Sequence, residues 1–223
     1  MIDESPVGIA GSTPPAEGPP DIDLRAVDGR LPGRRGLATR QRLLAATALL
    51  LETTGYRDLK VVEVAREAGT SPATFYQYFP DAESAVLVLA AELTEAWHDE
   101  LATLVADGDW IGNPDGAARH ASEGFLDFWT AHRAVLGVLD LASTEGDERF
   151  RDLRTWLLNG PTTAMVEVAA ASGAVGDPMA AAGVLVAMLA HVSNHQVGLE
   201  RWGVDRSALV ATMAGVLRRT LVA

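Results

Sequence analysis

Residues 61–79 read VVEVAREAGTSPATFYQYF, and this stretch decides the fold. Apolar residues recur in its first half at helical spacing, and Gly69 then suits the left-handed position that follows a helix C-terminus. Ser71 is a favoured N-cap and Pro72 is favoured at the first helical position, so a second helix begins there. The pattern predicts two short helices joined by a tight turn.

The aromatic side chains of the second helix indicate what its two faces do. Phe75 and Phe79 lie four residues apart and are expected to point into the core, whereas aromatics at 75, 76 and 78 cannot all share one face. A short helix presented in this way, after two helices with apolar stripes, is typical of a helix-turn-helix whose second helix enters the DNA major groove. The alternative is a connecting helix whose aromatics serve only the core.

The rest of the chain is also helical in pattern. An apolar stripe predicts a helix over 38–53, before the expected helices at 61–68 and 72–78. Further helices are expected over 81–107, 114–130, 133–143, 147–172 with an interruption at 160–161, 178–202 and 206–221. We therefore expect an all-α fold of about nine helices, in which a three-helix DNA-binding domain precedes a larger all-helical domain.

Charge is distributed unevenly along the chain. The formal net charge of −12 argues against nucleic acid, because affinity for phosphates comes largely from Lys and Arg. However, residues 34–80 carry 7 basic and 4 acidic side chains, whereas residues 1–33 carry 2 and 6 and residues 81–223 carry 9 and 20. The one basic segment coincides with the helix-turn-helix, as expected for a DNA-reading module.

Composition sets the domain boundaries and the compartment. Residues 1–33 hold six of the eleven prolines and lack apolar periodicity, which predicts a disordered tail before domains at 34–81 and 82–223. The longest apolar run, residues 179–190, is shorter than the roughly 18 residues of a membrane span, and no signal peptide is visible. We expect a cytoplasmic protein without membrane contact. The sequence has no cysteine, which excludes disulfides and thiolate chemistry.

On these features the sequence resembles the TetR family of ligand-responsive transcriptional regulators. The resemblance rests on the sequence at 42–46, 55–56, 61–65, 68–71 and 74–79. It implies a homodimer that binds a palindromic operator in double-stranded DNA, and a C-terminal domain that binds a small molecule and usually represses when empty. We therefore expect a repressor that is released by a small hydrophobic effector and has no cofactor.

The resemblance also implies which residues contact DNA. They are Thr39, Thr70, Ser71, Pro72, Ala73, Thr74, Tyr76, Gln77 and Tyr78. Gln77 is the candidate for base reading, because an amide can pair with the N6/N7 edge of adenine. Family members commonly have a lysine where this chain has Ala82. We expect Arg34 and Arg35 to compensate from an arm that reaches the adjacent groove, unless they are only a solvated pair on a flexible tail.

The C-terminal two-thirds of the chain holds candidates for two further sites. Large side chains that suit an effector pocket, and equally a plain core, are Trp97, Phe125, Phe128, Trp129, Leu136, Trp156 and Met165, with Asn194 as a polar neighbour. The last two helices suit either a dimer interface or closure of the subunit core, and the interface candidates are Ala187, His191, His195, Leu199, Leu209, Met213 and Leu217. No acidic partner completes a metal site beside the two histidines, so we expect no metal.

Two other classes of protein remain as alternatives. The sequence contains no catalytic triad order, phosphate loop or dinucleotide fingerprint, and we expect no enzyme activity. The first alternative is a regulator without an effector, in which the C-terminal domain only dimerises or binds a protein. The second is a small-molecule carrier or enzyme that uses the C-terminal cavity and retains a vestigial helix-turn-helix.

Overall fold

The computed structural model describes residues 27, 29, 33–173 and 176–222. This part of the chain is all-α, with no strand, and the expectation of an all-helical fold is confirmed. Its helices are α1 (Arg34–Leu51), a short 3-10 helix (Tyr56–Asp58), α2 (Val61–Glu67), α3 (Pro72–Tyr78), α4 (Ala82–Ala106), α5 (Pro114–Ala131), α6 (Arg133–Glu145), α7 (Glu148–Ser172), α8 (Pro178–Asn194), α9 (Gln196–Arg201) and α10 (Arg206–Leu221).

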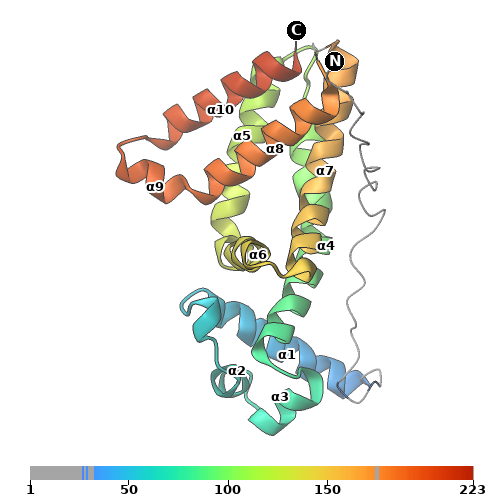
Figure 1. Ribbon diagram of the computed structural model, residues 1–223, viewed down its shortest axis with the longest axis vertical. Helices are drawn as coiled ribbons and strands as arrows, with labels where there is room; N and C mark the ends of the chain where they lie inside the picture. Colours follow the sequence, from blue (N-terminus) through green and yellow to red (C-terminus); the bar gives the residue numbers. More distant parts are fainter. Residues whose placement is uncertain (1–26, 28, 30–32, 174–175, 223) are drawn as a thin grey trace, which may run out of the picture.

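The molecule is elongated, and α4 connects its two ends. Figure 1 shows α1, α2 and α3 gathered at one end, with α8, α9 and α10 toward the other. The N-terminal part of α4 packs against α1, and most of its length packs against α7. Because one continuous helix belongs to both parts, a tilt of α4 relative to the body moves the three N-terminal helices with it.

The expected break in the helix over 147–172 is wrong, since α7 runs without interruption through Gly160 and Pro161. Proline removes only one backbone donor from the helix, and here the ring is buried in a packed interface. Gly160 allows that interface to be close, because a Cβ at this position would lie 2.9 Å from the carbonyl oxygen of His98 on α4. α7 therefore continues as a helix, packed closely on α4, where the sequence predicts a break.

The single helix expected over 178–202 is also wrong, because α8 ends at Asn194 and α9 begins at Gln196. His195 lies between them, with φ −97° and ψ 9°. Its ring folds over Gly198, where a Cβ would lie 2.5 Å from the imidazole. This close approach of the ring to Gly198 accompanies the turn that separates the two helices.

The two domains share one continuous hydrophobic core, which begins among α1–α3 and extends along α4 into the body. Its largest fully buried side chains include Phe75 in the N-terminal domain and Phe125 and Phe150 in the body. In the described residues no helix combines the length and the apolar character that crossing a membrane requires.

Candidate nucleic-acid interface

The turn between α2 and α3 is built from its own backbone hydrogen bonds. The amide of Thr70 donates to the carbonyl of Ala65 at 2.9 Å and the amide of Gly69 donates to Arg66 at 3.1 Å, which together form a Schellman motif. Gly69 has φ +65°, the left-handed conformation that favours glycine. The turn therefore fixes the angle at which α3 leaves α2.

α3 begins with the N-cap that the sequence predicts. Ser71 Oγ accepts a hydrogen bond from the amide of Thr74 at 3.2 Å and lies 3.0 Å from the Thr74 hydroxyl. Pro72 occupies the first helical position, where its missing amide hydrogen leaves no intrahelical bond unmade. Ser71 and Pro72 are exposed while Thr74 is half-buried, so the first turn of α3 is available to a ligand along one side.

The two faces of α3 differ as expected. Phe75 and Phe79 are buried, with ring centroids 5.5 Å apart. On the opposite face Ala73, Tyr76 and Gln77 are exposed, and Tyr76 retains 50% of its surface. The remaining candidates on this helix and the preceding turn, Tyr78 and Thr70, are half-buried.

Arg34 and Arg35, which were expected to form an arm, lie within a helix instead. The structure places Arg34 and Arg35 as the first two residues of α1, which begins before the expected boundary at 38. Both side chains are exposed, and Thr39 follows one turn later, where its hydroxyl accepts a hydrogen bond from Arg42 at 3.3 Å. The charges are thus presented from a helix end, so their reach into an adjacent groove is limited to the length of the side chains.

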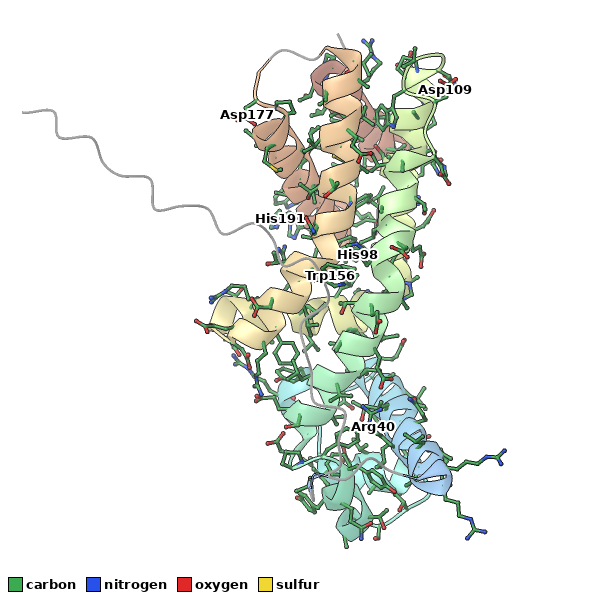
Figure 2. All side chains as sticks on the ribbon, turned by 90° about the vertical axis from the view of Figure 1, so that its right-hand side faces the viewer. Arg40, His98, Asp109, Trp156, Asp177 and His191 are labelled. Carbon is green, nitrogen blue, oxygen red and sulfur yellow. The ribbon has the colours of Figure 1, made fainter. Side chains whose placement is uncertain are left out.

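A part-buried ion pair joins α1 to α4. Arg40 on α1 is only 5% exposed and contacts Glu92 on α4 at 2.6 Å. Its guanidinium also lies 5.8 Å from the centre of the Phe79 ring, at the end of α3 (Figure 2). One side chain therefore fixes α1, α3 and α4 relative to one another.

A second set of contacts joins the N-terminal domain to the corner between α6 and α7. Arg57 pairs with Glu145, and Arg149 pairs with Glu83 at 2.6 Å. The Tyr56 ring packs edge-on against Phe150 at 6.2 Å. Burial raises the pKa of the Tyr56 hydroxyl to about 12, and the charge of Glu83 adds to this effect. The corner is therefore a second mechanical connection between the domains, beside α4.

Most of the expected effector-pocket residues are buried in the core. The centroid of the Trp97 ring lies 5.5 Å from that of Phe128 and 4.1 Å from that of His132. Burial lowers the pKa of the His132 imidazole. Phe125, Phe128, Trp129, Leu136 and Met165 are also buried. Trp156 is half-buried and stacks on His98 at 4.1 Å, between α4 and α7 (Figure 2).

A pocket of about 180 Å³ lies where the end of α5 meets α8 and α9. Two of the expected pocket residues, Trp129 and Asn194, line it. Its other lining residues are not among those expected from the sequence; they are Thr130, Arg133, Ser193, Gln196, Val197 and Glu200. No sequence signal marks them, because the turn at His195 that brings α9 onto α5 is itself absent from the helical pattern.

The expected dimer residues divide between two environments. Ala187, His191 and His195 are exposed, and the same side of α8 also exposes Val184. The other expected interface residues lie deeper: Leu199 and Leu209 are half-buried, and Met213 and Leu217 are buried within the subunit. The described residues contain no cluster of three or more side chains arranged to bind a metal ion.

The fold and the site together define a helix-turn-helix transcriptional regulator with an all-helical C-terminal domain. Residues 101–220 match the family described as "Tetracyclin repressor-like, C-terminal domain", and residues 43–84 match "Bacterial regulatory proteins, tetR family". The chain belongs to the TetR family. The regional matches agree with the resemblance found in the sequence.

Solved structures show the same fold at low sequence identity. The fatty acid degradation regulator FadR from Bacillus halodurans is 18% identical with a TM-score of 0.63, over 84% of this chain and 96% of that one. FadR from Bacillus subtilis, in complex with stearoyl-CoA, is 15% identical with a TM-score of 0.60, over 81% and 97%. A protein of unknown function from Rhodococcus sp. RHA1 is 21% identical with a TM-score of 0.67, over 83% and 96%. No curated protein matches the sequence.

Proposed function

We propose that this chain is a homodimeric repressor that binds a palindromic operator and is released by a small effector. The observation that carries the proposal is the exposed face of α3, where Ala73, Tyr76 and Gln77 lie opposite a fully buried Phe75. This face belongs to the one segment of the chain with a positive net charge. A helix that offers hydrogen-bonding groups from a basic module is suited to contact both base edges and phosphates.

The connection between the domains supports release by an effector. Both α4 and the α6–α7 corner join the DNA-binding helices to the body, so a change in the body repositions α3. In a dimer the spacing of two such helices must match two half-sites, about 34–36 Å apart for successive turns of DNA. A ligand that favours a different spacing lowers operator affinity. The stearoyl-CoA bound to Bacillus subtilis FadR is consistent with a small-molecule effector in this fold.

The exposed side of α8 supports the dimer. Val184 is 68% exposed, and Ala187, His191 and Gly183 continue the same stripe at helical spacing. We expect light scattering to give the mass of a dimer and the variant Val184→Glu to give a monomer, because two carboxylates would face each other across the two-fold axis. Ile111→Glu is the matched control, since Ile111 is 81% exposed but lies outside α8. A monomeric wild type contradicts the dimer.

Operator binding is tested by selecting genomic DNA fragments on the purified full chain and then measuring affinity against salt. We expect an enriched palindrome. If Arg34 and Arg35 of two subunits neutralise about four phosphates, the slope of log K against log salt is about −3.6 or steeper. A shallow slope with no enriched palindrome contradicts the proposal. Raised transcription from an operator-controlled promoter after deletion of the gene supports repression, and lowered transcription contradicts it.

A further inference from the structure

Two residues that line the pocket between α5, α8 and α9 have buried polar atoms without a hydrogen-bond partner in the described residues. Trp129 and Ser193 both line it, and they are only 4% and 6% exposed. Within the described residues neither the indole nitrogen of Trp129 nor the hydroxyl of Ser193 has a hydrogen-bond partner. A buried polar group without a partner is costly, so two of them in one pocket wall favour a ligand that satisfies both.

The hydroxyl of Ser193, like that of Ser143 on α6, has no hydrogen-bond partner in the described residues. Ser122 and Thr130, on α5, each donate to the carbonyl one turn earlier, at 2.8 and 2.7 Å. That local bond is the ordinary way for a helical serine or threonine to satisfy its hydroxyl. Ser193 is deeper in the protein than Thr130 and makes no such bond. Its hydroxyl therefore has no local hydrogen-bond partner in the described residues.

The third polar group at the pocket is a cation. Arg133, the first residue of α6, lines the pocket and is exposed. Within the described residues no carboxylate pairs with its guanidinium, although seven other ion pairs are present there. The acidic residue at the rim, Glu200, accepts a hydrogen bond from Gln196 at 3.0 Å. The carboxylate of Glu200 is thus held by its own helix.

The donors and the volume define the class of ligand. An indole N–H and a guanidinium are donors only, and a hydroxyl can donate as well, so the ligand group they suit is an acceptor with negative charge. Trp129 and Val197 are the large apolar residues among those that line the pocket. A volume of about 180 Å³ corresponds to roughly six water molecules. This excludes a molecule as large as stearoyl-CoA.

We propose that this pocket binds a small monocarboxylic acid, whose carboxylate accepts hydrogen bonds from Trp129, Ser193 and Arg133 and whose hydrocarbon part lies against Val197. The proposal names the class of effector for the repressor proposed above. Binding of the acid does not depend on that function, but its effect on DNA binding does. That consequence has a route, because Asn194 at the rim donates to Asp140 on α6 at 2.9 Å, and Asp140 also pairs with Arg154 on α7 at 2.6 Å. Both helices lead to the corner that contacts the DNA-binding helices.

The test is calorimetric titration of the purified full chain, without DNA, with benzoate, phenylacetate and hexanoate. Benzamide and benzyl alcohol are the uncharged comparisons. We expect saturable binding of at least one acid, and binding of the uncharged analogues about tenfold weaker or more, because hydrogen bonds to charged groups are the stronger ones. No saturable binding of any acid up to millimolar concentration, or equal affinity for benzoate and benzamide, overturns the proposal.

Matched variants separate the site from general effects on the fold. Trp129→Phe and Ser193→Ala each remove one donor, and we expect each to weaken binding of the acid about tenfold. Trp156→Phe and Ser143→Ala are the controls, because their polar atoms are likewise buried without a partner in the described residues but lie outside this pocket. Thermal melting checks that all four variants fold. Equal losses in the variants and the controls would overturn the assignment.

The outcomes for the pocket and for the repressor are distinguishable. Acid binding that lowers operator affinity supports both proposals. Acid binding without any change in operator affinity supports the pocket and contradicts its effector role. If the chain selects no DNA but binds the acid with the expected variant pattern, the proposed repressor fails while the pocket stands.

Discussion

The ion pair between Arg40 and Glu92 predicts an asymmetry between two single substitutions. Arg40 is 5% exposed, whereas the Glu92 side chain is 32% exposed and also lies 3.4 Å from the Gln41 amide. Glu92→Ala leaves a buried cation without its counter-charge, which costs about 3–5 kcal/mol of folding free energy. Arg40→Met leaves a carboxylate that water and Gln41 can satisfy, so the cost is about 1–3 kcal/mol. The acidic partner is therefore the more damaging one to remove.

The difference of about 2 kcal/mol corresponds to about 4–8 °C in melting temperature for a chain of this size. The assay is thermal unfolding followed by circular dichroism at one protein concentration, because dimerisation makes the midpoint depend on concentration. The double variant Arg40→Met with Glu92→Ala is expected to melt near Arg40→Met alone, since it contains no unpaired buried charge. An equal drop for the two single variants, or costs that simply add in the double variant, would refute this reasoning.

Three further predictions concern DNA reading, alkaline stability and helix packing. Gln77→Ala is expected to relax sequence preference, whereas Tyr76→Phe weakens binding to all sequences alike, as measured by binding to operator and random DNA; equal losses on both DNAs for both variants contradict this division. Because the folded pKa of Tyr56 is about 12 and the unfolded value is 10.0, the unfolded chain loses that proton first, so stability falls as pH rises from 10 toward 12. Tyr56→Phe should flatten that fall in urea titrations, and an unchanged pH profile excludes Tyr56 as its cause. Gly160→Ala should lower the melting temperature despite the better helix propensity of alanine, because the added Cβ would lie 2.9 Å from the backbone of α4. Gly137→Ala on α6 should raise the melting temperature, because no atom lies within 4 Å of the added Cβ.

The DNA-binding domain was predictable because its signals are local. Gly69, Ser71 and Pro72 each favour one backbone conformation, and the structure contains the corresponding turn and cap within the same few residues. The face of α3 followed from the positions of Phe75 and Phe79 alone, since helical geometry leaves a single orientation that buries both. Contacts that depend only on near neighbours in the chain can be inferred without knowledge of the tertiary fold.

The errors in the body have the opposite character. Gly160 and Pro161 are ordinary signals for a helix break, and the close approach of α4, distant in sequence, overrides them. The break at His195 carries no proline and no favoured capping residue, and it depends on the imidazole packing over Gly198. At Gly160 a contact with a residue distant in the sequence decides the backbone, and propensity is too weak a term to resist it, whereas the break at His195 accompanies a contact between residues only three apart.

The same reasoning explains why the sequence indicates a pocket but not its chemistry. Trp129 and Ser193 read as an aromatic and a small polar residue on two helical patterns, and most such residues belong to a core or make a local bond. Their polar atoms have no partner within the described residues, and the two residues line one pocket together with residues of α9. The proposed acid site therefore depends on the turn at His195 as much as on the pocket residues. A change that straightens α8 into α9 should abolish acid binding while leaving the DNA-binding helices intact.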